Sequence, residues 1–99
     1  MTDEQRTWAE QEMVRGFERN PVPVHMQDGL IEYVIQRRDP GHFLTAVLEN
    51  NLVGAIGRAD SSNLKALQNW VRVCYNYIPS TCWGTPAKVK AWLNRTEEI

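Results

Sequence analysis

Five prolines divide this sequence into segments in which apolar residues recur at helical spacing. Proline lacks a backbone N–H and restricts the residue before it, so helices end at or before such positions. Asn20-Pro21-Val22-Pro23 ends a first predicted helix, and Asp39-Pro40-Gly41 forms a turn after a second one. Pro79 ends a long helix, and Thr85-Pro86 begins the last one, because proline suits the first helical position. The chain is therefore expected to be all-α.

Five or six helices are expected around one core, with their starts set by capping residues. Thr2 and Gln5 fit a capping box, and Asp60 caps the longest helix. Asn50-Asn51 favours a left-handed break between two short helices, although a strand is the alternative for so short an apolar run. The predicted helices cover about residues 2–18, 26–37, 42–49, 52–58, 61–78 and 86–94.

Regular apolar spacing selects the expected core residues. A row with alternating steps of three and four residues, here called the apolar seam, runs along the longest predicted helix through Leu64, Leu67, Val71, Cys74 and Ile78. The predicted core contains Leu30, Ile31, Val34, Phe43, Leu44, Val47, Leu64, Leu67, Val71, Cys74, Val89 and Leu93.

Ninety-nine residues make about one domain. The proline-rich residues 21–25 are expected to link an N-terminal helical extension, residues 1–20, to a compact helical core, residues 26–95. Residues 96–99 are expected to form a frayed tail. The extension is expected to be separable from the core and to be available for self-association.

The composition limits where the chain works and which cofactors it holds. No apolar run approaches the roughly 20 residues that span a bilayer, and the acidic, polar N-terminus is the reverse of a signal peptide. We therefore expect a cytoplasmic protein that does not bind membranes, with Cys74 and Cys82 as free thiols. Two cysteines without clustered histidines cannot form a structural zinc site, so neither a metal nor another cofactor is expected.

Candidate catalytic groups are few. His25 and His42 adjoin turns and lie in no catalytic signature. Cys82 lies three residues before the Thr85 cap, where a helix N-terminus favours a thiolate, and the alternative is a half-buried thiol beside Trp83. Because nothing combines a nucleophile, a base and an orienting group, we expect no catalytic residue and a protein that is not an enzyme.

Four tryptophans in 99 residues are more than a small helical core is expected to absorb. Trp70 and Trp92 fall on buried faces, whereas Trp8 lies off the apolar face of its helix. Trp83 lies in a loop, and exposed tryptophan and arginine often carry interface energy. The predicted protein-binding residues are Trp83, Trp8 and Arg58, unless the two tryptophans lie flat over the edge of the core.

Charge is unevenly distributed along the chain. Residues 1–49 carry nine acidic and five basic side chains, whereas residues 50–95 carry six basic side chains and one acidic side chain, Asp60. The basic half is either an ordinary solvated surface or a face for an acidic partner. The alternative function is therefore nucleic-acid binding, through a predicted face of Lys65, Asn69, Arg72, Lys88 and Lys90.

Several short blocks in the chain are distinctive as a set. The first block is Phe43-Leu44-Thr45-Ala46-Val47-Leu48, followed by Asn50 and Leu52. The other two blocks are Gly57-Arg58-Ala59-Asp60 and Cys82-Trp83-Gly84. With these blocks, residues 24–93 resemble a family of small uncharacterised proteins encoded mainly by tailed bacteriophages and prophages. The resemblance implies a phage accessory protein that binds a host or phage protein in the bacterial cytoplasm, for example to inhibit a defence nuclease or to redirect a metabolic enzyme. It carries over no catalytic or binding residue.

Overall fold

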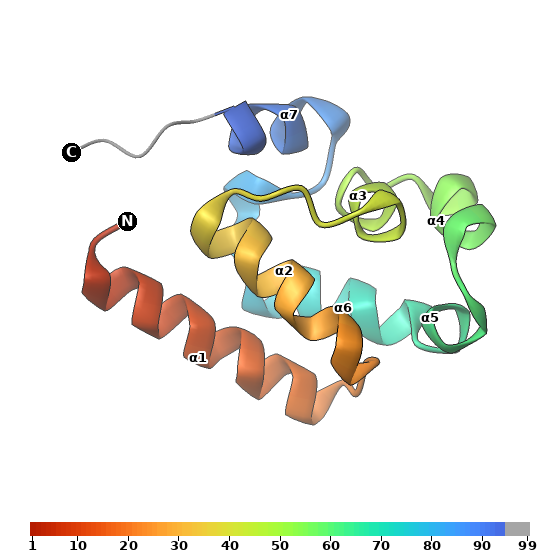
Figure 1. Cartoon of the computed structure of the whole chain (residues 1–99), viewed down its shortest axis with the longest axis horizontal. Coiled ribbons are helices and arrows are strands. Elements are labelled where there is room, and N and C mark those ends of the chain that lie inside the picture. Colours follow the sequence, from red (N-terminus) through yellow and green to blue (C-terminus); the bar gives the residue numbers. More distant parts are fainter. Residues whose placement is uncertain (95–99) are drawn as a thin grey trace.

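Helices make up most of the computed structural model, which describes residues 1–94 (Figure 1). The all-α prediction is confirmed, but the described part has seven α-helices rather than five or six, and the predicted tail, residues 96–99, lies outside it. The elements are α1 (Asp3–Arg19), α2 (Val24–Gln36), α3 (His42–Leu48), α4 (Leu52–Arg58), α5 (Ser61–Lys65), α6 (Leu67–Tyr77), the short 3-10 turn η1 (Ser80–Cys82) and α7 (Pro86–Asn94).

Local capping chemistry sets several helix ends as the sequence predicts. Thr2 and Gln5 form a complete capping box at the start of α1. Asp60 accepts a hydrogen bond from the Asn63 N–H at 2.8 Å, which caps α5. Asn50 adopts the left-handed conformation, with φ of 63°, and so separates α3 from α4. Short-range hydrogen bonds are enough to fix these boundaries.

The extra helix arises where the predicted long helix breaks at Ala66. This residue has φ of −93° and ψ of 4°, outside the helical region, and it ends α5 and precedes α6. The apolar seam therefore does not continue in register. Trp70 and Val73 of α6 turn into the core, whereas Leu64 is 47% exposed and Val71 is 43% exposed.

The core prediction holds for most residues and fails at two residues of the apolar seam, Leu64 and Val71. Those buried as predicted are Leu30, Val34, Phe43, Leu44, Val47, Cys74 and Val89. Three others, Ile31, Leu67 and Leu93, are partly buried against the core. Leu64 and Val71 were wrongly assigned to the core, because periodicity alone does not show which side of a helix other helices cover.

Trp70 lies at the centre of the core and joins four helices. Its indole is fully buried, and it meets Phe17 of α1 and Phe43 of α3 edge to face, with ring centroids 6.2 and 6.4 Å away. The indole N–H donates to the side chain of Asn63 in α5 at 3.1 Å. The polar ends of both buried side chains are thus satisfied within the core.

Helix α1 shares this core. Met13 and Phe17 are buried, and the helix packs along α6 and α2. The division at residues 21–25 stays a prediction, but these contacts favour one continuous core over a separable extension made of residues 1–20.

The C-terminal part is tied to α2 by two long-range hydrogen bonds. The hydroxyl of the buried Tyr33 donates to the carbonyl of Cys82 at 2.7 Å, and the indole N–H of Trp92 donates to the carbonyl of Tyr33 at 2.9 Å. The guanidinium of Arg37 stacks over the Trp92 ring, 3.8 Å from its centroid. These contacts fix η1 and α7, and with them the loop that carries Trp83.

The close approach of α1 to α6 predicts that Gly16→Ala destabilises the protein. A Cβ at Gly16 would lie 2.7 Å from Cγ of Tyr77, so one of the two helices must shift. We expect a loss of about 1–3 kcal/mol in the free energy of unfolding, measured in urea, despite the higher helix propensity of alanine.

Gly57→Ala provides the matched control, because a Cβ at this helical glycine meets no atom within 4 Å. It should raise stability by roughly 0.5–1 kcal/mol. Equal stabilisation by both substitutions would show that α1 does not pack on α6 as described.

Candidate protein-binding surface

The three predicted protein-binding residues lie in three different places. Trp8 is 64% exposed on α1, as its position off the apolar face predicts. Arg58 is exposed at the end of α4, on the opposite side of the molecule from the first half of α1 (Figure 1). Trp83 is only partly buried and follows η1. The structure thus does not bring the three residues together.

The Trp83 loop is held firmly against the body of the protein. Gly84 adopts φ of 117°, which favours glycine, and its N–H donates to the carbonyl of Leu48 at 2.6 Å. The Trp83 ring meets Tyr75 of α6 edge to face, with centroids 6.2 Å apart. Tyr75 itself is 75% exposed. The two rings therefore form a fixed aromatic pair that is partly open to solvent.

An apolar groove between α4 and α6 continues this surface. Its floor is the C-terminal end of α3, the same segment that holds the Trp83 loop through Leu48. Tyr75 lies one turn beyond Val71, so the groove leads toward the aromatic pair. The residues that line the groove are Val47, Asn50, Asn51, Leu52, Ala55, Leu67 and Val71. We call these residues, together with Tyr75 and Trp83, the apolar strip.

The α4 wall of the strip is unusually exposed for a helix with an apolar sequence. Ala55 is its one buried residue, whereas Leu52 is 62% exposed and Ile56 of the same face is 47% exposed. The sequence shows that these residues are apolar, but it does not show that α4 packs mainly along α3. The sequence therefore did not predict that Leu52, Val71 and Tyr75 lie on the surface.

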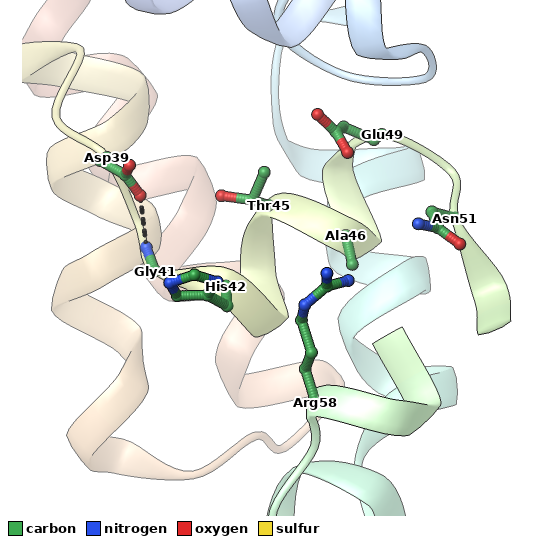
Figure 2. A pocket seen from close by; sticks show the side chains of 8 residues that line it. All are labelled: Asp39, Gly41, His42, Thr45, Ala46, Glu49, Asn51 and Arg58. Carbon is green, nitrogen blue, oxygen red and sulfur yellow. Dashed lines mark hydrogen bonds between the residues drawn. The ribbon is translucent and has the colours of Figure 1, made fainter. Parts of the chain in front are cut away.

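A separate polar hollow of about 260 Å³ lies on the other side of α3. Figure 2 shows its lining: the side chain of Arg58 reaches in from α4, while Asp39 and Glu49 lie at its edges. The carboxylate of Asp39 accepts a hydrogen bond from the Gly41 N–H at 2.8 Å, which fixes the turn before α3. The hollow therefore places side chains of opposite charge around one opening.

In residues 1–94, no hydrogen bond joins the side chain of His42 or Thr45 in this polar hollow to a carboxylate. Across the same residues, no three His, Cys, Asp or Glu side chains are grouped to hold a metal ion. None of the helices described has the length and apolar character needed to cross a bilayer.

Both cysteines are buried free thiols, as expected for the reduced state. Burial raises the pKa of Cys82 to about 12 and raises the pKa of Cys74 still further above its ordinary value. The Cys82 thiol donates to the carbonyl of Pro79 at 3.0 Å. The predicted alternative of a covered thiol fits this environment better than a reactive thiolate.

The residues predicted as a nucleic-acid face are dispersed. Lys65 and Asn69 line a hollow beside the linker, and the amide of Asn69 donates to the carbonyl of Pro21 at 2.8 Å. Arg72 is exposed on α6. On α7, Lys88 donates to the carbonyl of Ser80 at 3.2 Å. Lys90 of the same helix lines a hollow that also contains the carboxylates of Asp39 and Glu49.

Comparisons with protein-family models, with curated proteins and with solved structures gave no match to this chain. The resemblance to phage-encoded proteins stays a prediction from the sequence blocks. The function is therefore argued from the apolar strip and its surroundings.

Burial of both thiols predicts that the native protein resists thiol-reactive dyes at pH 8. Covered, protonated Cys74 and Cys82 react only when the structure opens. We expect slow labelling with Ellman's reagent in buffer and prompt labelling of both thiols in denaturant. Fast labelling of native Cys82 would contradict its placement.

The same thiols predict a loss of stability at alkaline pH. In the unfolded chain they ionise near roughly pH 8.5, whereas burial raises both pKa values in the folded chain. Their contribution is complete below that pH and decreases as the pH rises above it. Urea unfolding at pH 7.5 and at pH 9.5, with Cys74→Ala as a comparison, would measure this loss.

Proposed function

We propose that this protein is a non-enzymatic binding module that docks on another protein through the apolar strip. One observation carries the proposal: Leu52, Val71 and Tyr75 remain exposed along a continuous surface that ends on the fixed Tyr75–Trp83 pair. Small proteins rarely leave a contiguous apolar surface uncovered unless it binds something. In the context that the sequence resemblance implies, the partner is a host or phage protein in the bacterial cytoplasm.

Docking through this strip is energetically favourable because its side chains are already positioned. Covering apolar surface contributes about 25 cal/mol per Å², and the Trp83 loop is already held by the Gly84–Leu48 hydrogen bond. Little conformational freedom is then lost on binding. Trp83 and Tyr75 supply the aromatic contact typical of the residues that dominate protein interfaces.

Nucleic-acid binding is the competing proposal, and charge placement favours it less. Lys65 and Asn69 adjoin the linker, whereas Lys90 shares its hollow with two carboxylates. A phosphate backbone is bound best by a continuous row of cations without intervening acids. Self-association through α1 is a further possibility, and Trp8 is its exposed aromatic residue.

The test compares Tyr75→Ala with Trp8→Ala, two exposed aromatic residues on different helices. Each variant is used to capture partners from bacterial lysate with and without nuclease treatment, and affinity for the captured protein is then measured. Tyr75→Ala should weaken binding more than tenfold, about 1.4 kcal/mol, whereas Trp8→Ala should leave it nearly unchanged. Both should keep the wild-type unfolding temperature within a few degrees.

Trp83→Ala should weaken binding by a similar factor. Because Trp83 is partly buried, this substitution separates binding from stability less well than Tyr75→Ala does. The paired change Lys65→Ala with Arg72→Ala should matter less. Binding that survives Tyr75→Ala, or that is lost with nuclease or at moderate salt, would instead favour the nucleic-acid proposal.

A further inference from the structure

The apolar strip and the charges around it indicate which kind of partner segment binds there. Building on the proposed function, we propose that the apolar strip binds an amphipathic helix of the partner protein, and that the flanks of this helix carry Asp or Glu side chains. Two independent features support this: the shape of the groove and the charges around it.

The groove is formed by two helices and matches the spacing of a third. On one wall, Leu52 and Ala55 lie three residues apart on α4, on the same side of the helix. On the other wall, Leu67, Val71 and Tyr75 recur at steps of four residues and extend about 12 Å along α6. A helix that presents apolar side chains at i, i+3 or i+4, and i+7 covers this length.

Pairing with an extended peptide is disfavoured at this surface. Residues 1–94 contain no β-strand, so this part of the chain offers no sheet edge to which a strand could be added. The backbone of α3 and α6 at the groove is already hydrogen-bonded within the helices. Side-chain packing in the groove, rather than backbone pairing, must therefore provide affinity.

Cations border the strip, and acids are absent from its lining. Arg72 is exposed and lies three residues before Tyr75, so the two side chains are neighbours on the surface of α6. Lys88 lies beside the Trp83 end, with its amine 3.9 Å from the Cβ position of Gly84. None of the described residues in the strip is acidic.

Arg58 lies on the polar-hollow side of Asn51, where it shares the opening with Asp39 and Glu49. Asn51 lines both the groove and the polar hollow, and it caps α4 by accepting a hydrogen bond from the Gly54 N–H at 2.9 Å. A Cβ at Gly54 would lie 2.7 Å from the Arg58 guanidinium, so glycine leaves room for this side chain to fold back over α4. The nearby acid, Asp60, is engaged in capping α5.

This arrangement selects the charge of the partner. Arg72 and Lys88, beside a strip whose described lining holds no acid, attract carboxylates at the edges of a docked helix and repel lysines placed there. The carboxylates would meet these cations at the rim, where water remains, so their main effect is on selectivity and association rate. The apolar residues in the centre provide most of the affinity.

The test uses two designed helical peptides of about 16 residues, long enough to form roughly four turns. Both carry the same apolar face of leucines, and one has glutamate flanks where the other has lysine flanks. Binding to the full chain is followed by fluorescence anisotropy at low and moderate salt. The glutamate peptide should bind at least tenfold more tightly than the lysine peptide at low salt, and Tyr75→Ala should weaken it at least tenfold.

Charge reversal at the rim identifies the cations that select the peptide. Arg72→Glu combined with Lys88→Glu should remove or invert the preference for glutamate flanks. The matched control is Arg15→Glu combined with Lys65→Glu, which changes the net charge equally, on α1 and beside the linker. The control should keep the preference, and thermal unfolding should show that both variants are folded.

Several outcomes would overturn this inference. The first two are that both peptides bind with equal affinity and that neither peptide binds. The third is that a single-stranded oligonucleotide binds more tightly than the glutamate peptide. The fourth is that the protein sediments as a dimer and that Tyr75→Ala dissociates this dimer. If the peptides fail while Tyr75→Ala still abolishes capture of a protein, the proposed function stands and the partner segment is of another kind. If Tyr75→Ala has no effect in either assay, the strip is not a binding surface.

Discussion

The buried indole of Trp70 is the contact on which the rest of the structure depends. Phe17 and Phe43 pack edge to face on it, and Asn63 accepts its N–H, so one side chain connects α1, α3, α5 and α6. A buried polar group without a partner costs about 1–3 kcal/mol, so Asn63 and Trp70 must stay together. This pair fixes α5 relative to α6, on either side of Ala66.

The binding surface is a consequence of that central packing. Because α6 directs Trp70 and Val73 inward, its Val71 and Tyr75 lie on the open side. Helix α4 then follows α3 and buries little more than Ala55. An apolar groove remains between α4 and α6. One face of α6 therefore stabilises the core, while the adjoining residues stay exposed at the surface where we propose that a partner docks.

Charge and apolar surface are arranged differently on the two sides of α3. The polar hollow combines Asp39 and Glu49 with Arg58, whereas the apolar strip is bordered by cations and lined by no acid among the described residues. The polar hollow, with charges of both signs, attracts no particular sign of charge. The apolar strip, with cations at its border, is the surface for which we propose an acidic partner. Arg58 lies near both surfaces, so its role in binding has to be separated from that of Arg72 and Lys88 by mutation.

The sequence by itself determined the helical class, most helix ends and most core residues. These features depend on residues that are neighbours in the chain: the caps at Thr2 and Asp60, the left-handed conformation of Asn50, and the spacing of apolar residues. It also indicated Trp83 as a loop aromatic residue. Only the tertiary structure decided that the helix breaks at Ala66, that Val71 is exposed and that Trp83 meets Tyr75. Whether a side of a helix is covered depends on contacts between residues distant in sequence, and local patterns do not contain that information.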